Sequence, residues 1–264
     1  MYRLVAVVIL VVGMARGAVA QSILPGLIQT TPQADRDKVS TEISQFITRL
    51  NNKRTTLNDQ AFLQLIFSET HRRFLKTYKP YAQFADVFQK AQYDCLSATS
   101  LLAVVLDAFG FDFTVIETNY HIFISVQTTN GQVLLESTDR QNGFVTNALA
   151  IEQRISTYQQ NKPVAYAGNK VYYEFDLNLY QVVQPHQLAG LLLFNQAIVA
   201  FNEGDVPESA RKLKAAVRIY DSPRTNEFAA ILITAIVNSQ MPQEEKVDLI
   251  RSLYGYINRS VAAR

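Results

Sequence analysis

The segment that follows the single cysteine most constrains the fold of this chain. Apolar residues between Leu96 and Phe109 make a segment that is apolar on nearly every side of a helix, and Gly110 ends it. A helix that is apolar on all sides is buried in a protein interior, and glycine is a common helix end. The sequence therefore predicts a central buried helix with Cys95 at its N-terminus. With 264 residues, 48% of them hydrophobic, the chain can cover such a helix in one or two packed domains.

Three short runs after this helix indicate β-strands. They read "FDFTVIETN", "YHIFISVQ" and "QVLLESTD", and the first two are rich in β-branched and aromatic residues. Asn130-Gly131 between the last two is a hairpin signal. Helical patterns precede Cys95, residues 148–160 predict another helix, and residues 163–177 a further hairpin. This order predicts an α+β fold, with N-terminal helices, the buried Cys-bearing helix and an antiparallel sheet.

The last third of the chain has a different pattern. Helical stretches are separated by "NEGDVPES", "YDSPRTNE" and "NSQMPQEE". The spacing of small residues within 192–223 resembles one tetratricopeptide unit, although an ordinary helical pair fits equally well. We therefore expect an α+β domain at residues 35–177 and an all-α region at residues 178–264. Residues 21–34, with two prolines and a glycine, are expected to be a linker.

The first 20 residues have the pattern of a secretory signal peptide. Arg3 is followed by about 11 apolar residues and by a small-residue cleavage site ending at Ala20. A membrane anchor is the alternative, but spanning a bilayer takes roughly 20 apolar residues. We expect an exported protein, periplasmic or secreted, with no membrane span in the mature chain. The formal net charge of +2, with scattered Lys and Arg, disfavours nucleic acid as a partner.

Cys95 is an unusual residue for an exported protein, because oxidising compartments favour cysteines in pairs. One interpretation is a buried cysteine that acts as a small hydrophobic residue. The other is a nucleophile, which reacts as the thiolate and therefore needs a lowered pKa. A helix N-terminus and a nearby histidine base would both lower it.

The chain has three histidines that could be this base. His71 lies beside two arginines and is expected on a solvated helix surface, and His186 is expected to start the final helical region. His121 begins the strand that follows "ETN", so it can face the N-terminus of the Cys95 helix. We therefore expect His121 to be the base.

A base also needs a carboxylate that orients the imidazole, and Glu136 and Asp139 are both candidates. If Asn130-Gly131 forms a two-residue turn, Glu136 lies opposite Ser125. Ser125 is four residues from His121 along their strand, so Glu136 would lie about 13 Å from His121. A longer loop or a bulge would bring it closer, while Asp139 lies on the other face. The spacing leaves both candidates open.

These residues resemble the core of the transglutaminase-like superfamily, which shares a cysteine, histidine and carboxylate arrangement with papain-like proteases. The resemblance rests on "DCLSATSLLAVVLDAFGFDF", "YHIFISV" and "GQVLLEST", in this order. It implies that Cys95 is the nucleophile, His121 the base and Glu136 the orienting residue, with backbone N–H groups of Cys95 and Leu96 binding the oxyanion. Glutamate stands where the family has aspartate, and the chain has no tryptophan.

The resemblance implies a thiol-dependent enzyme that hydrolyses or transfers the acyl group of an amide bond in a protein or peptide. Such chemistry needs no metal and no cofactor. The alternative is a non-catalytic scaffold that binds a protein partner through its helical C-terminal region. A third interpretation, redox sensing by the thiol, leaves the downstream strand pattern unexplained.

Overall fold

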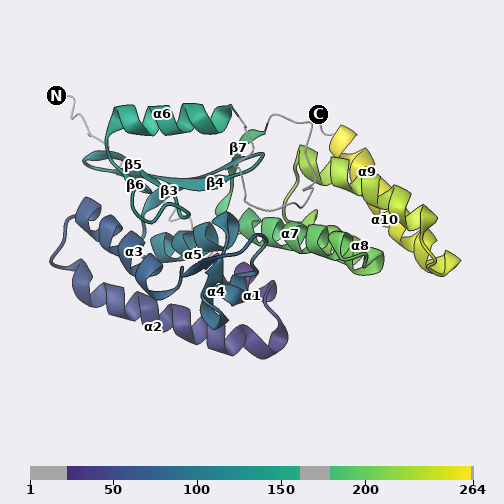
Figure 1. The fold of residues 1–264 in the computed structure, drawn as a ribbon, viewed down its shortest axis with the longest axis horizontal. Coiled ribbons are helices and arrows are strands. Elements are labelled where there is room, and N and C mark those ends of the chain that lie inside the picture. Colours follow the sequence, from purple (N-terminus) through teal and green to yellow (C-terminus); the bar gives the residue numbers. More distant parts are fainter. Residues whose placement is uncertain (1–22, 161–178, 263–264) are drawn as a thin grey trace, which may run out of the picture.

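A computed structural model describes residues 23–160 and 179–262 (Figure 1). This part of the chain is an α+β protein with a five-stranded antiparallel sheet, as the sequence predicts. The expected signal peptide and the hairpin expected within residues 163–177 lie outside the described residues. Across the described ranges, every helix is too short or too polar to cross a membrane.

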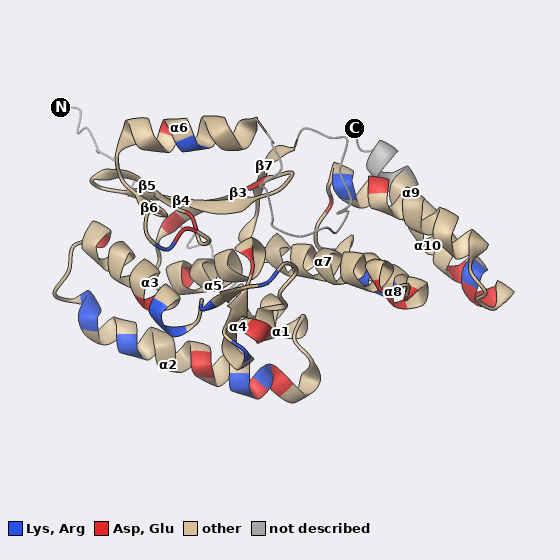
Figure 2. Ribbon diagram, viewed as in Figure 1, with Lys and Arg blue, Asp and Glu red and all other residues tan. Residues whose placement is uncertain are grey.

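Helices and two short strands form the N-terminal part. They are α1 (Leu24–Gln29), η1 (Gln33–Asp35), α2 (Arg36–Arg54), α3 (Asp59–Arg73), β1 (Thr77–Tyr78), α4 (Phe84–Gln89) and β2 (Gln92–Tyr93). Their packed faces show the helical spacing of the sequence: α2 buries Val39, Ile43, Phe46 and Leu50. Along α2, basic and acidic residues are interspersed (Figure 2).

The described part of the expected linker, residues 23–34, contains a helix that packs on the main core. Its helix α1 buries Leu27, which is 1% exposed, in the main core. Pro25 lies in the first turn of α1, where a proline is tolerated because its missing N–H has no helical partner. The proline and glycine that suggested a linker therefore belong to a short helix.

The predicted central helix is α5 (Cys95–Ala108). Its residues from Leu96 to Leu106 are all buried, and Gly110 follows its end with a φ of 69°, a backbone conformation that glycine adopts without strain. The helix lies between the N-terminal helices and the sheet (Figure 1). It is therefore the centre of the main core.

The sheet has the strand order β6-β5-β4-β3-β7. Its strands are β3 (Asp112–Thr118), β4 (Ile122–Thr128), β5 (Gly131–Leu135), β6 (Phe144–Val145) and β7 (Tyr180–Val183). One face packs on α5, and helix α6 (Ala148–Gln159) covers the other (Figure 1). A separate cluster holds α6 on that face, formed by Ile116, Phe123, Leu134, Val145 and Ile151.

The region expected to be helical from residue 178 onward begins with a strand. Strand β7 pairs with β3, with Val183 opposite Val115 and Tyr180 opposite Thr118. The run Tyr-Gln-Val-Val is rich in residues that favour strands. Its partner β3 lies far back in the sequence, so no hairpin signal marks this pairing.

Helices follow β7 and the short turn η2 (Pro185–Gln187). They are α7 (Leu188–Asn202), α8 (Val206–Ala216), α9 (Pro223–Asn238) and α10 (Gln243–Ala262). The first half of α7, including Leu188 and Leu192, packs in the main core. Its second half, including Phe194 and Ala197, packs with α8 to α10 in a second core. One helix therefore contributes to both cores.

Candidate functional site

The N-terminus of α5 packs against the start of β4 and the end of β5. Asp94 caps the helix, because its Oδ1 accepts a 2.7 Å hydrogen bond from the Ser97 amide. Thr99 Oγ1 donates to the Ile122 carbonyl at 3.4 Å, and Ser137 Oγ donates to the Cys95 carbonyl at 3.3 Å. Cys95, His121 and Glu136 are thus brought to the same corner of the molecule.

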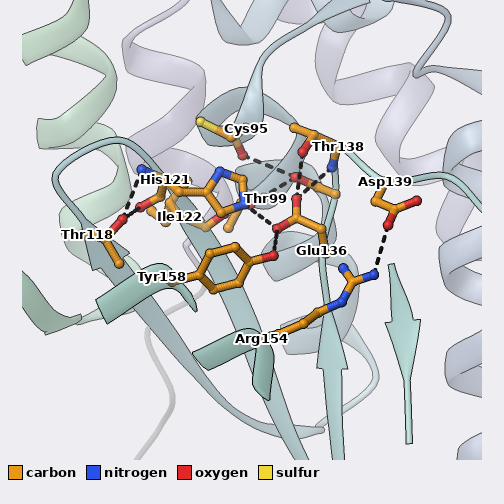
Figure 3. Close-up of polar contacts among 11 residues, drawn as sticks. Cys95, Thr99, Thr118, His121, Ile122, Glu136, Thr138, Asp139, Arg154 and Tyr158 are labelled. Atoms are coloured by element: carbon orange, nitrogen blue, oxygen red, sulfur yellow. Dashed lines mark hydrogen bonds and ion pairs between the residues drawn. The ribbon is translucent and has the colours of Figure 1, made fainter. Parts of the chain in front are cut away.

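His121 and Glu136 contact each other directly (Figure 3). The imidazole Nε2 meets the carboxylate Oε2, and the two side chains are 8% and 3% exposed. The other carboxylate oxygen accepts hydrogen bonds from the Thr138 amide at 2.9 Å and its hydroxyl at 2.7 Å. Burial raises the pKa of Glu136, but His121 and Thr138 outweigh burial and bring this pKa to about 2. The carboxylate is therefore ionised and fixed.

The hairpin turn explains why Glu136 reaches His121. Thr128 pairs with Gly131, so Thr129 and Asn130 form the turn, one position earlier than the sequence suggested. The register sets Leu135 opposite Ile124 and, one step further, Glu136 opposite Phe123. Glu136 is then two residues from the position opposite His121, instead of four, which a glutamate side chain can span.

Asp139, the other candidate for the orienting residue, has different partners. Its Oδ2 accepts a 2.9 Å hydrogen bond from Arg154, and its Oδ1 accepts one from the Asn142 amide, also at 2.9 Å. Burial raises the pKa of Asp139, but these hydrogen bonds outweigh it and hold the pKa below its usual value. Asp139 therefore belongs to the loop after β5, and Glu136 holds the imidazole.

The Cys95 thiol differs from the expectation of a lowered pKa. The residue is only partly exposed, and burial raises the thiol pKa well above its usual value, with further increases from the charges of Asp94 and Glu136. The backbone amides of Leu96 and Cys95 lower this pKa by less. Within the described residues, no hydrogen bond joins the sulfur to His121. The resting thiol is therefore protonated at neutral pH.

The Leu96 amide, an expected oxyanion donor, interacts with both the Cys95 thiol and the Asp94 carboxylate. It stabilises the ionised forms of both groups. Asp94 is buried, and burial raises its pKa to about 6 despite the hydrogen bonds from Ser97. Above that pH, a carboxylate competes for the helix N-terminus.

Tyr158 is a site residue that the sequence analysis missed. Its hydroxyl donates a 2.8 Å hydrogen bond to Glu136 Oε2, the oxygen that contacts His121 (Figure 3). Its ring lies 5.0 Å from the His121 ring between centroids. Burial, followed by the charge of Glu136, raises the pKa of this phenol, so it donates throughout the physiological range. The spacing of Ile151, Ile155 and Tyr158 on one face of α6 could have indicated a residue that points at the sheet.

Tyr158→Phe is expected to lower the free energy of unfolding by about 1 kcal/mol, because it deletes one hydrogen bond and keeps the ring contact. Urea unfolding at pH 7 measures this change. Tyr254→Phe, at an exposed tyrosine of α10, is the matched control and should leave stability unchanged. Equal stability of both variants would contradict a stabilising role for the contact with Glu136.

His71 was expected on a solvated surface, and this expectation is wrong. The residue is 1% exposed, and its ring lies 4.6 Å from the Phe67 ring between centroids. Among the residues that the structure describes, neither ring nitrogen has a hydrogen-bond partner. Burial, aided by Arg140, lowers the pKa of His71 to about 4, although Asp139 and Glu136 act in the opposite direction. This histidine is therefore neutral and lies beneath the loop that carries Glu136.

The comparisons with known proteins do not assign a family. No family model matches the chain, and no curated protein matches it. A solved structure with similarity is a crystal structure of menin that describes its binding site for the Mixed Lineage Leukemia (MLL) protein. It has a TM-score of 0.36 and 12% identity, and the match covers 90% of this chain and 58% of the menin chain. This chain thus spans less than two thirds of that protein, and so weak a similarity carries no argument about function.

Proposed function

We propose that this protein is a thiol-dependent acyl-transfer enzyme of the transglutaminase-like superfamily, with Cys95 as nucleophile, His121 as base and Glu136 as orienting residue. The observation that carries the proposal is the buried contact between His121 and Glu136 at the N-terminus of the Cys95 helix. A fixed carboxylate that holds one imidazole nitrogen leaves the other, Nδ1, for proton transfer. The substrate class is an amide bond in a protein or peptide.

Cys95, His121 and the backbone amides can carry out each step on an amide substrate with water as the acceptor. His121 Nδ1 takes the thiol proton as Cys95 Sγ bonds to the amide carbon, and backbone N–H groups of Cys95 and Leu96 stabilise the oxyanion. Collapse of this intermediate breaks the C–N bond, and the imidazolium protonates the leaving amine. Water, activated by His121, then cleaves the thioester and restores the thiol. An amine in place of water gives acyl transfer.

Because the pKa of the Cys95 thiol is raised, the thiol loses its proton during the reaction and not before it. The thiol stays neutral in the resting protein, and His121 takes its proton as the sulfur attacks, so general-base catalysis replaces a preformed thiolate. The charge that forms on His121 is stabilised by the ionised Glu136. Removal of His121 should therefore be nearly as damaging as removal of Cys95.

Casein serves as the test substrate for both reactions. Peptide release from casein measures hydrolysis, and incorporation of dansylcadaverine measures transfer. Cys95→Ala and His121→Gln are each expected to abolish product formation, by about 10⁴-fold or more. The control is Ser68→Ala, at an exposed serine of α3 outside the site, which should retain full activity.

A second candidate function is a non-catalytic scaffold that binds a protein through the helical region. The raised thiol pKa favours it, as do the exposed apolar side chains Val237, Val247 and Tyr254 on α9 and α10. The rate of Cys95 alkylation by iodoacetamide distinguishes the two functions. A site with a working base should react at least about tenfold faster than its His121→Gln variant. Equal rates, with no product from casein, would favour the scaffold.

A further inference from the structure

Arg224, in the first turn of α9, contacts the segment that leads into His121. Its guanidinium Nη1 lies 2.6 Å from Glu117 Oε1, near the end of β3. Its Nη2 donates a 2.6 Å hydrogen bond to the carbonyl of Asn119, two residues before His121. The Arg224 and Glu117 side chains are only 11% and 3% exposed. The helical region and the sheet are therefore joined by a buried ion pair.

Glu117 is the centre of a polar cluster and accepts hydrogen bonds from several donors. Besides Arg224, it accepts hydrogen bonds from the Tyr220 hydroxyl at 2.5 Å and from Gln181 Nε2 at 2.9 Å. These donors come from the segment before α9 and from β7. A buried carboxylate with several donors has little freedom to move. The cluster thus sets where α9 lies relative to the end of β3.

The loop between β3 and β4 is short and tightly bonded. The Thr118 amide donates to the His121 carbonyl at 2.8 Å, and the His121 amide donates to Thr118 Oγ1 at 3.1 Å. Asn119 Oδ1 also accepts a 2.6 Å hydrogen bond from the Leu179 amide, just before β7. Only Asn119 and Tyr120 lie between Thr118 and His121. A displacement of Asn119 therefore displaces the backbone of His121.

We propose that Arg224 is a positioning residue for His121, so that the helical C-terminal region is a working part of the Cys95 site. Its bond to the Asn119 carbonyl fixes the loop, and the loop fixes the imidazole against Glu136. The inference rests on the proposed function, in which His121 is the base. It predicts that a ligand or partner which shifts α9 changes the reactivity of Cys95.

The test uses the full chain with Arg224→Gln and Glu117→Gln combined, so that no buried charge is left without a partner. Two quantities are measured: the ¹⁵N shifts of the His121 ring and the rate of Cys95 alkylation by iodoacetamide. We expect changed ring shifts and an alkylation rate lowered about tenfold to a hundredfold, because misplacements of about 1 Å have effects of this size. Arg211→Gln, at an exposed arginine of α8 that pairs with Glu208, is the matched control and should change neither.

Arg224→Lys is the second variant, since lysine keeps the charge beside Glu117 but lacks the planar fork whose two nitrogens reach Glu117 and the Asn119 carbonyl separately. If the double variant fails to fold, the same two measurements on Arg224→Lys test the proposal. Wild-type ring shifts and alkylation rates in a folded variant would overturn the proposal. Changed ring shifts, with no casein product from the wild-type protein, would keep the link between Arg224 and His121 and refute the proposed function instead.

Discussion

A Gly143→Ala variant is expected to lose about 3 kcal/mol of folding stability and to separate Glu136 from His121. Gly143 closes the loop after β5, where its amide donates to the Asp139 carbonyl and its carbonyl accepts from the Glu136 amide, both at 2.8 Å. A Cβ at this position would lie 2.2 Å from the Glu136 carbonyl oxygen and 2.3 Å from that of Asp139. Backbone atoms cannot rotate away, so the loop must move, at the upper end of the usual overpacking range.

Gly255→Ala provides the control for this variant. Gly255 lies inside α10, and a Cβ there would meet no atom within 4 Å. The same substitution should therefore stabilise the protein by about 1 kcal/mol, because alanine has the higher helix propensity. Urea unfolding at pH 7 gives both values, and the ¹⁵N shifts of the His121 ring report the site. A Gly143→Ala variant as stable as the wild type would contradict the close approach of Gly143 to the Glu136 and Asp139 carbonyls.

The second large effect is a loss of stability on acidification that depends on His71. Its pKa is about 4 in the folded protein and about 6.5 in the unfolded chain. His71 is mostly neutral in both states at pH 7, so it has little effect on stability there. As the pH falls below about 6.5, the unfolded chain binds the proton first, and the folded state loses roughly 3 kcal/mol by pH 4.

His71→Leu isolates this contribution, since leucine fills a similar volume and does not titrate. The measurement is the free energy of unfolding in urea at pH 7 and pH 4.5 for both proteins. Asp94 acts in the opposite direction in this window, because its raised pKa of about 6 adds stability as the pH falls. Both proteins keep Asp94, so its effect cancels in the comparison. An equal decrease in stability for the two proteins would show that His71 titrates normally.

The parts of the fold that the sequence predicted are those with strong local patterns. The helix α5 is apolar on nearly every side, and the spacing of Phe62, Ile66 and their neighbours indicates α3. What failed depended on partners distant in the sequence. Strand β7 forms because its backbone pairs with the edge of β3. The arginines that follow His71 suggested a surface, although the four-residue steps Leu63, Phe67 and His71 mark the buried face of that helix.

The sequence predicted which residues to consider for the candidate site but not their geometry. Cys95 and His121 were candidates from their positions along the chain, while the spacing left Glu136 and Asp139 open and only the family resemblance favoured Glu136. The contact between His121 and Glu136 depends on the hairpin register, which a shift of the turn by one residue changes. Tyr158 comes from a helix on the other face of the sheet, and the raised thiol pKa comes from burial and from two carboxylates. Local sequence patterns report neither.

The position of α7 in both cores has a consequence for how the protein unfolds. Without this helix, the side chains around α5 would lose Leu188, Leu191 and Leu192 as neighbours, and the remaining helices would lose Phe194 and Ala197. Neither half would keep a closed interior, so each depends on the other for its cooperativity. Heating should therefore melt the sheet and the C-terminal helices in one transition, and a protease that cuts within α7 should release no stable fragment.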